Sequence, residues 1–359
     1  MMARITRLCS TALAAVLLLN GSIVNAQQED DEIDTSLEPR PAVMAARASS
    51  ALLLDVTRAG GQLVAVGQRG NILRSQDGKT WQQAPVPVDT TLTRVRFADA
   101  QHGWAVGYDA AVLATEDGGQ SWQQLHYDAR WARPYYDIHF TDSQNGLVAG
   151  ANGTLLATHD AGQSWAQVES DAFEEGPNLY NLIVLGDGSL LIVGERGFLA
   201  RSFDAGQTWQ RLNSPYSGPL FGALPINQKG LLIFGLRGNV FYAENIDQCQ
   251  ILTTEIRQAQ LDAELDPEQA NTLSALRDVP GWRAMDNEST ESLYGGTVGA
   301  NGQITLVGGN GHVMQVSLSN QQVTRLPITP ANNMNAGVML DHDLVVAGTN
   351  GVQRIALTP

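Results

Sequence analysis

The sequence predicts an all-β fold, a seven-bladed β-propeller with Asp-box turns and a helical insertion in blade five. Three observations predict it. An eight-residue pattern ending in tryptophan recurs at a nearly constant period, a glycine-bounded hairpin signature occurs seven times, and one expected copy of the tryptophan pattern is replaced by a longer stretch. A period of just over forty residues is typical of stacked structural repeats.

The tryptophan pattern is the Asp-box, which reads Thr-His-Asp-Ala-Gly-Gln-Ser-Trp at residues 158–165. Related copies occupy residues 115–122 and 202–209, and a shorter copy occupies residues 75–81, so successive tryptophans lie 41, 43 and 44 residues apart. Asp can accept hydrogen bonds from N–H groups of its own turn, Gly supplies a positive φ, and Trp begins the next strand. We therefore assign structural roles to Asp77, Trp81, Asp117, Trp122, Asp160, Trp165, Asp204 and Trp209.

The hairpin signature is a short apolar run that ends in glycine, with glycine or alanine three residues later. An apolar run, a glycine-bounded turn and a second apolar run are typical of a β-hairpin. Seven such hairpins, each followed by one more strand, predict seven four-stranded blades. The first glycines of the seven copies are Gly67, Gly107, Gly150, Gly194, Gly235, Gly308 and Gly348.

Residues 1–26 have the organisation of a secretory signal peptide. Arg4 and Arg7 precede a short apolar run, and a small-residue stretch ends at Ala26. We expect cleavage after Ala26 and export to the periplasm. An uncleaved membrane anchor is the alternative, which the short apolar run disfavours. Residues 27–38 are acidic and polar, and are predicted to form a disordered leader.

The last blade lacks a strand in the sequence. After Gly351, residues 352–357 suffice for one strand but not for two. A propeller must close its ring or expose the edge of a sheet. We therefore predict that residues 39–47 supply the outer strand of the last blade, so that the propeller spans residues 39–359.

Blade five has no Asp-box. Trp282, the next candidate for the start of an outer strand, stands 73 residues after Trp209. Residues 246–280 are therefore predicted to form an insertion, with helices over residues 253–264 and 267–277. Because the insertion replaces an Asp-box turn, we expect it to project from the face that carries the other Asp-boxes.

Charge and composition exclude several classes of function. The formal net charge is -15, and it is -17 once Arg4 and Arg7 are removed with the signal peptide, which disfavours nucleic acid and anionic membranes as partners. The six histidines show no metal-ligand spacing, and there is no phosphate loop, nucleophile elbow or redox cysteine pair. We expect no metal, no cofactor and no direct membrane insertion after cleavage, and a monomeric protein.

Counting back from each hairpin glycine locates the innermost strand of each blade. The residues at this register are Asp55, Arg94, Asp137, Asn181, Gly222, Gly295 and Asn335. Their predecessors, which point to the opposite side of the strand, are Leu54, Thr93, Tyr136, Tyr180, Phe221, Tyr294 and Met334. Several aromatic residues at one register favour packing between blades over a ligand-stacking ring.

The link from blade two to blade three has the most unusual composition, Tyr-Asp-Ala-Arg-Trp-Ala-Arg-Pro-Tyr-Tyr at residues 127–136. Links between blades lie on the face opposite the Asp-boxes, beside the mouth of the central channel. Arginine and aromatic residues are enriched at interface hot spots, although they can equally stack on one another for local order. The candidates for partner binding are Arg94, Arg96, Arg130, Trp131, Arg133, Tyr135, Tyr180 and Tyr216.

The repeat made of His-Gly-Trp-Ala-Val-Gly at residues 102–107 and the Asp-box at residues 115–122 resembles those of the photosystem II stability and assembly factor family. These are Asp-box propellers of the thylakoid lumen, with relatives in non-photosynthetic bacteria. The resemblance implies a non-enzymatic protein that binds membrane-protein intermediates, in photosynthetic members through an arginine-rich patch. The candidates for that patch here are Arg94, Arg96, Arg130 and Arg133.

Bacterial relatives in this family are associated with resistance-nodulation-division (RND) exporters. The resemblance therefore implies a periplasmic scaffold, assembly factor or accessory factor that binds a membrane-protein or envelope complex. The insertion in blade five departs from the family's repeat pattern.

Two other functions stay open. A secreted, sialidase-like glycoside hydrolase would need two carboxylates, for which Asp55 and Asp137 are available. Against it, sialidases have six blades and an Arg-Ile-Pro segment that this sequence lacks. A non-catalytic binder of glycans or small molecules would use the channel mouth.

Overall fold

The fold is described from a computed structural model, in which residues 38–265, 278–328 and 332–357 are placed. The predicted signal peptide and the leader up to residue 37 lie outside the described residues. Within the described ranges, no helix is both long and apolar enough to cross a membrane.

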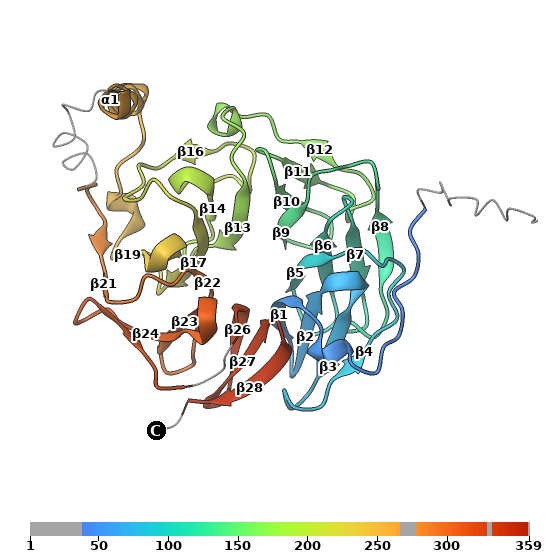
Figure 1. Cartoon of the computed structure of the whole chain (residues 1–359). Coiled ribbons are helices and arrows are strands. Elements are labelled where there is room, and N and C mark those ends of the chain that lie inside the picture. Colours follow the sequence, from blue (N-terminus) through green and yellow to red (C-terminus); the bar gives the residue numbers. More distant parts are fainter. Residues whose placement is uncertain (1–37, 266–277, 329–331, 358–359) are drawn as a thin grey trace, which may run out of the picture. The chain divides into compact units, whose positions relative to one another are not determined.

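Seven sheets, antiparallel except for one short pairing in blade six, surround a central axis and form the predicted seven-bladed propeller (Figure 1). In each blade the strands are given from the innermost outward. Blade one contains β1 (Leu53–Ala59), β2 (Gln62–Gly67), β3 (Ile72–Ser75) and β4 (Gln82–Gln83). Blade two contains β5 (Leu92–Phe97), β6 (Gly103–Gly107), β7 (Val112–Thr115) and β8 (Gln123–His126). Blade three contains β9 (Tyr135–Phe140), β10 (Gly146–Gly150), β11 (Leu155–Thr158) and β12 (Ala166–Gln167).

Blade four contains β13 (Leu179–Val184), β14 (Leu190–Gly194), β15 (Leu199–Ser202) and β16 (Gln210–Arg211). Blade five contains β17 (Leu220–Ile226), β18 (Gly230–Gly235), β19 (Val240–Ala243) and β20 (Arg283–Ala284), with helix α1 (Thr254–Leu265) between its two outer strands. Blade six contains β22 (Leu293–Val298), β23 (Ile304–Gly308), β24 (Val313–Ser317) and β25 (Gln322–Arg325), and β21 (Asp286–Asn287) pairs in parallel with β25. Blade seven contains β26 (Met334–Leu340), β27 (Asp343–Gly348) and β28 (Gly351–Ala356).

Short 3-10 turns join several of these strands. They are η1 (Ala48–Ser50), η2 (Gln68–Gly70), η3 (Asp171–Phe173), η4 (Glu195–Gly197), η5 (Leu236–Gly238), η6 (Ile246–Gln248) and η8 (Gly309–Gly311).

The strand order gives the ring two faces. The hairpins between second and third strands share one end with the links between blades, and we call this end the connection face. The hairpin of a blade bonds to the link that follows it: Gly70 N donates to Thr90 O at 2.6 Å, and Gly153 N donates to Pro177 O at 2.7 Å. The Asp-box turns lie at the opposite end, which we call the Asp-box face.

The repeated hairpin glycine is required by a bulge in the innermost strand. In every blade the pairing of the first two strands shifts by one residue beside this glycine. The shift brings a carbonyl so close that a Cβ on Gly107 would lie 2.1 Å from Thr91 O. The bulged residues are Leu54, Thr93, Tyr136, Tyr180, Phe221, Tyr294 and Asn335. The predicted register is therefore one residue off in blade seven, where Ala336 takes the place assigned to Asn335.

The Asp-box turns have the hydrogen bonds that their residue types predict. Asp160 Oδ1 accepts from Ser164 N at 2.9 Å, and Trp165 Nε1 donates to Gly162 O at 3.0 Å. Gly162 has a φ of 88°. The same pattern occurs around Asp77, Asp117 and Asp204, and it places Trp81, Trp122 and Trp209 at the start of the outer strand.

These turns predict a loss of stability in acid. Bonds from the N–H groups of Thr80 and Lys79 lower the pKa of Asp77 to about 2, and bonds from the Ser164 hydroxyl and N–H do the same for Asp160. A pKa that is lower in the folded chain means that the stabilisation is complete above the unfolded value of 3.8 and is lost as the pH falls towards 2. We expect the melting temperature to fall over this range, and to fall less in an Asp77→Asn, Asp160→Asn variant. Parallel pH profiles for variant and parent would contradict this role.

The predicted closing strand is wrong. Residues 39–47 form no strand, and blade seven has three strands among the described residues. The segment runs instead along the outer edge of blade one, where Ala42 N donates to Val86 O at 2.9 Å and Gln83 bonds the backbone of Val43 and Ala45. This edge offers the same unpaired backbone groups that blade seven offers.

The ring closes through side chains. Ala48 and Leu53 share one hydrophobic cluster with Ala336 and Val345 of blade seven. Across the same junction, Asn335 Nδ2 donates to Leu53 O at 2.9 Å. Apolar packing between the first and last blades therefore replaces the predicted sheet pairing.

The insertion differs from its prediction in one respect. The helix predicted over residues 253–264 is confirmed as α1, and the helix predicted over residues 267–277 lies outside the described residues. Residues 250–252 pair with the open edge of β16, since Leu252 N donates to Arg211 O at 3.0 Å. This pairing brings α1 to the connection face, where Arg257 meets Glu175, so the expected projection from the Asp-box face is wrong.

Candidate partner-binding face

The central channel is lined on one side by a buried network around Asp137, whose side chain is 0% exposed. Arg96 donates to both carboxylate oxygens, from Nε at 3.1 Å and from Nη2 at 3.0 Å. Asn181 Nδ2 and the N–H groups of Leu182 and Ile138 donate to the same carboxylate at 2.7, 2.9 and 2.9 Å. Asp137 therefore ties blades two, three and four together.

Neighbouring blades are linked in the same way. Asp55 accepts from Val95 N at 3.0 Å, and Asn181 Oδ1 accepts from Ala223 N at 3.0 Å, so each side chain bonds the backbone of the next blade. Arg94 lies between the two carboxylates, at 3.5 Å from Asp55 and 3.5 Å from Asp137. Two arginines thus balance two aspartates inside the channel.

Within this network the Asp137 carboxylate is poorly suited to act as a catalytic acid. Burial alone would raise the pKa of Asp137, but the charges of Arg96 and Arg94 and the bond from Leu182 N outweigh it and leave the pKa lowered. A glycosidase acid needs a raised pKa and contact with substrate. Asp137 is instead ionised and enclosed, as expected for a structural ion pair.

The opposite side of the channel carries small residues at the same register. Gly222, Gly295 and Ala336 stand where the first four blades have polar side chains. The channel that remains has a volume of about 320 Å³.

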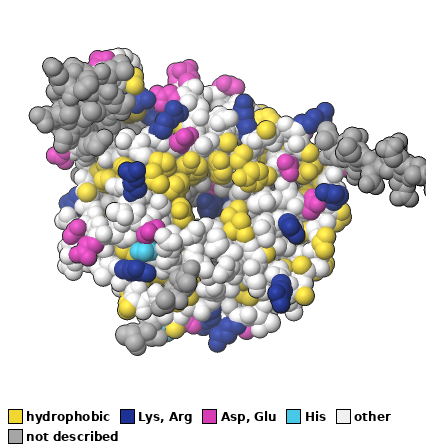
Figure 2. All heavy atoms as spheres, in the orientation of Figure 1, with side chains coloured by type: hydrophobic (Ala, Val, Ile, Leu, Met, Phe, Trp, Pro, Cys, Tyr) yellow, Lys and Arg dark blue, Asp and Glu magenta, His cyan; other side chains and the backbone are white. Residues whose placement is uncertain are grey.

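An arc of aromatic rings borders the channel mouth on the connection face. Bulged residues of blades three to six form it, and we call Tyr136, Tyr180, Phe221 and Tyr294 the aromatic arc. Adjacent ring centroids are 5.4, 5.6 and 5.4 Å apart, and all four side chains are half-buried. Figure 2 shows hydrophobic side chains gathered in a band beside the centre of the ring.

The bulge explains why these rings are displayed. A bulged residue is left unpaired and its side chain is re-aimed, here towards the channel mouth. Burial raises the pKa of Tyr136 to about 12, with a further contribution from Tyr180, so the phenol stays neutral. The arc therefore offers continuous, uncharged aromatic surface.

The structure divides the predicted arginine patch. Arg94 and Arg96 are held in the channel by aspartates, whereas Arg130 is 79% exposed on the link from blade two to blade three. On the same link, Arg133 lies over Trp131 at 5.6 Å. A single patch of four arginines is therefore a wrong prediction, because buried carboxylates at the innermost strand attract the first two.

The remaining candidates occupy three places. Trp131 and Tyr135 lie together beside Arg133, with ring centroids 6.5 Å apart. Tyr180 belongs to the aromatic arc. Tyr216 lies on the link from blade four to blade five, packs at 6.1 Å from Phe241, and lines a separate pocket beside α1. Apart from Arg94 and Arg96, which lie in the channel, the predicted residues thus share the connection face but do not form one cluster.

The other arc residues share the register of Tyr180, but nothing in the sequence marks them as a site. The sequence favours packing between blades for Phe221 and Tyr294, and the bulge that exposes them has no sequence signal beyond the hairpin glycine. Arg211 and Arg257, which line the pocket beside α1, were also missed. They lie far apart in sequence and meet only because the insertion pairs with blade four.

Comparison with known proteins supports the photosystem II assembly factor family, which the sequence repeats also resemble. Residues 73–133 and 126–223 match the family model described as photosynthesis system II assembly factor YCF48. Over 53 residues the chain is 38% identical to the photosystem II stability/assembly factor HCF136, chloroplastic, of Cyanidioschyzon merolae. This match covers 14% of the chain and only 12% of the relative's length.

Solved structures share the fold. A structure described as YCF48 bound to D1 peptide aligns with a TM-score of 0.59 at 17% identity, covering 90% of this chain and 100% of the other. An ancestral GH74 enzyme aligns with a TM-score of 0.61 at 11% identity, covering 89% of this chain and 46% of the enzyme. At these identities the alignments show the propeller fold alone.

Proposed function

We propose that this photosystem II assembly factor-like propeller binds an extended segment of a membrane-protein partner on its connection face, without catalysing a reaction. The aromatic arc carries the proposal. Four contiguous, half-buried rings supply apolar area at low entropic cost, because aromatic side chains have few rotatable bonds. Arg130 and Arg133, on the neighbouring link, add donors for carboxylates at the rim.

The similarity to assembly factors supports this reading. A propeller with this fold was solved with a D1 peptide bound, and the relative that is 38% identical over 53 residues is named as a stability and assembly factor. An arc of rings beside a channel fits an extended peptide better than a large flat partner, because its width is that of one row of side chains.

We also propose a periplasmic location for the protein. Residues 1–26 read as an export signal, and the acidic chain suits a periplasmic protein that does not bind anionic membranes by itself. A periplasmic accessory or assembly role at an inner-membrane complex, such as an RND-type transporter, follows from the bacterial branch of the family.

A capture experiment tests the face. We expect a Tyr180→Ala, Phe221→Ala variant to capture at least about tenfold less partner from detergent-solubilised membranes than the parent does, since truncated hot-spot residues cost at least about 2 kcal/mol each. An Arg130→Glu, Arg133→Glu variant should weaken capture less, because both side chains lie at the rim.

The matched control is Phe203→Ala. Phe203 is an aromatic side chain that is 66% exposed on the Asp-box face. Its variant should capture as much partner as the parent. Loss of capture with Phe203→Ala, and full capture with the arc variant, would move the binding site to the Asp-box face.

The enzymatic alternative has its own test. Purified protein should turn over no compound in a panel of chromogenic glycosides that includes sialosides. Turnover that is abolished by Asp137→Asn in a folded variant would replace the proposal by a glycoside hydrolase, and binding without turnover in a glycan screen would favour a glycan-binding protein.

A further inference from the structure

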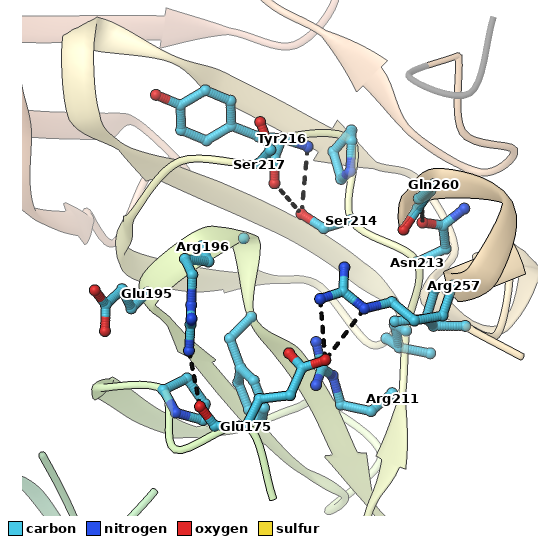
Figure 3. A pocket seen from close by; sticks show the side chains of 16 residues that line it. Glu175, Glu195, Arg196, Arg211, Asn213, Ser214, Tyr216, Ser217, Arg257 and Gln260 are labelled. Atoms are coloured by element: carbon cyan, nitrogen blue, oxygen red, sulfur yellow. Dashed lines mark hydrogen bonds and ion pairs between the residues drawn. The ribbon is translucent and has the colours of Figure 1, made fainter. Parts of the chain in front are cut away.

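A pocket of about 330 Å³ lies on the connection face between blade four and α1 (Figure 3). Its walls come from two links between blades, from η4 and from α1. The insertion is fixed there by polar contacts: Gln260 Nε2 donates to Asn213 Oδ1 at 3.0 Å, and Asn213 N donates to Gln250 O at 2.7 Å. The pocket therefore exists only because the insertion crosses the edge of β16.

Three arginines line this pocket. Arg257 directs both Nε and Nη2 to one oxygen of Glu175, at 3.1 and 3.0 Å, and Arg196 Nη2 donates to the backbone oxygen of Glu175 at 2.9 Å. Arg211 completes the set from β16, the outer strand of blade four. Figure 3 shows Arg257 directed at the Glu175 carboxylate and Arg196 directed at the backbone oxygen of Glu175.

Arg211 is the least satisfied of the three. Its guanidinium lies over the Phe198 ring at 4.3 Å, and Nη1 donates to Ala172 O at 3.3 Å. Its Nε is buried, and no described residue accepts a hydrogen bond from it. Burial lowers the pKa of Arg211, and the charges of Arg257 and Arg196 add to this effect against Glu175. A buried donor without a partner is costly, so an acceptor brought by a ligand would be favourable.

The charges of the pocket favour a ligand with one negative charge. Three guanidinium groups face two carboxylates, and Glu195 is already engaged by Asn178 N at 3.2 Å. One positive charge is left over, which a monoanion neutralises and a dianionic phosphate would exceed. Planar carboxylates also match the planar donors of arginine. Phe198, Leu212 and Tyr216 give the pocket apolar walls.

We propose that this pocket binds a carboxylate on a small apolar body, either the end of a peptide or a small organic acid. The proposal goes beyond the function assigned to the aromatic arc, because the pocket needs neither the arc nor a membrane protein to bind its ligand.

The first test uses N-acetylphenylalanine and its amide as matched probes, titrated into the whole protein and followed by nuclear magnetic resonance. The acid should shift the signals of the Arg211 Nε–H and the Gln260 side-chain amide, and the neutral amide should bind at least about tenfold more weakly. Equal binding of both probes, or binding of neither, would overturn the proposal. Capture of a partner by the aromatic arc would be unaffected by that failure.

Three variants locate the site. Arg257→Gln should weaken binding of the acid about tenfold, because it removes a guanidinium that is 37% exposed and so dispensable for folding. Glu175→Gln should tighten binding, since it removes the carboxylate that competes with the ligand. Arg69→Gln is the control, because Arg69 holds the same hairpin position in blade one that Arg196 holds in blade four. Weaker binding with Glu175→Gln, or equal losses with Arg69→Gln and Arg257→Gln, would contradict the site.

Probes of different length distinguish the end of a peptide from a free organic acid as the source of the carboxylate. If acetyl-Ala-Ala-Phe binds more tightly than N-acetylphenylalanine, the pocket takes the end of a peptide chain. If the two bind equally, it takes a free organic acid. Binding of inorganic phosphate in preference to both acids would overturn the proposed carboxylate specificity.

Discussion

Asp137→Ala is expected to destabilise the protein by about 3–5 kcal/mol, the range found when one partner of a buried ion pair is removed. The variant loses five hydrogen bonds to the carboxylate and leaves Arg96 without its bidentate partner. Because those bonds join three blades, the loss should appear as one lower midpoint in urea unfolding, measured with the parent under the same conditions.

Two further variants define the origin of that loss. Asp137→Asn keeps the shape and one of the two acceptor oxygens but removes the charge, and should fall between the parent and Asp137→Ala. Glu116→Ala removes an exposed carboxylate from an Asp-box turn and should change the midpoint little. If Asp137→Ala were as stable as Glu116→Ala, the network would not hold the blades together.

Gly107→Ala is expected to destabilise the protein by about 1–3 kcal/mol or more, the cost of forcing extra atoms into a packed interior. The added Cβ would lie 2.1 Å from Thr91 O and 2.8 Å from Leu92 Cα. Both are backbone atoms, so no side chain can rotate away. Urea unfolding of the variant measures this directly.

Gly61→Ala is the matched control, since a Cβ there meets nothing within 4 Å. It should be neutral or slightly stabilising, because alanine reduces the conformational entropy of the unfolded chain. Equal stability of the Gly107 and Gly61 variants would mean that the hairpin glycine is not required by the bulge.

The fold could be predicted from the sequence because the residues of each repeat determine the local geometry of its turns. Asp160, Gly162 and Trp165 satisfy one another's hydrogen bonds within a single turn, so their spacing is enough to identify it. The hairpin glycines mark a close approach of backbones that recurs in every blade. Such sequence patterns are local, so they can be recognised without knowledge of the rest of the chain.

Two wrong predictions about the fold concern segments that can pair with more than one sheet edge. Residues 39–47 bond the outer edge of blade one through Val86 and Gln83, although a free edge in blade seven was predicted to attract them. Residues 250–252 similarly bond β16, which turned α1 towards the connection face. Both edges offer the same backbone donors and acceptors, and the choice depends on the course of the chain in three dimensions.

The candidate site was predicted only in part for a similar reason. The sequence gives arginines and aromatic residues but not their partners in space. The sequence predicts one patch of arginines, but Asp55 and Asp137 pair with Arg94 and Arg96 and hold them in the channel. The aromatic arc depends on aromatic residues at the bulged position of blades three to six, and the composition of one link does not reveal it.

The most direct test of the proposed binding face is a photo-crosslink made in membranes. A benzoylphenylalanine residue placed at Tyr180, in the aromatic arc, is compared with the same residue at Phe203 on the Asp-box face, after both variants are shown to be folded. We expect a crosslinked membrane protein from position 180 and none from position 203. A crosslink from position 203 alone would contradict it.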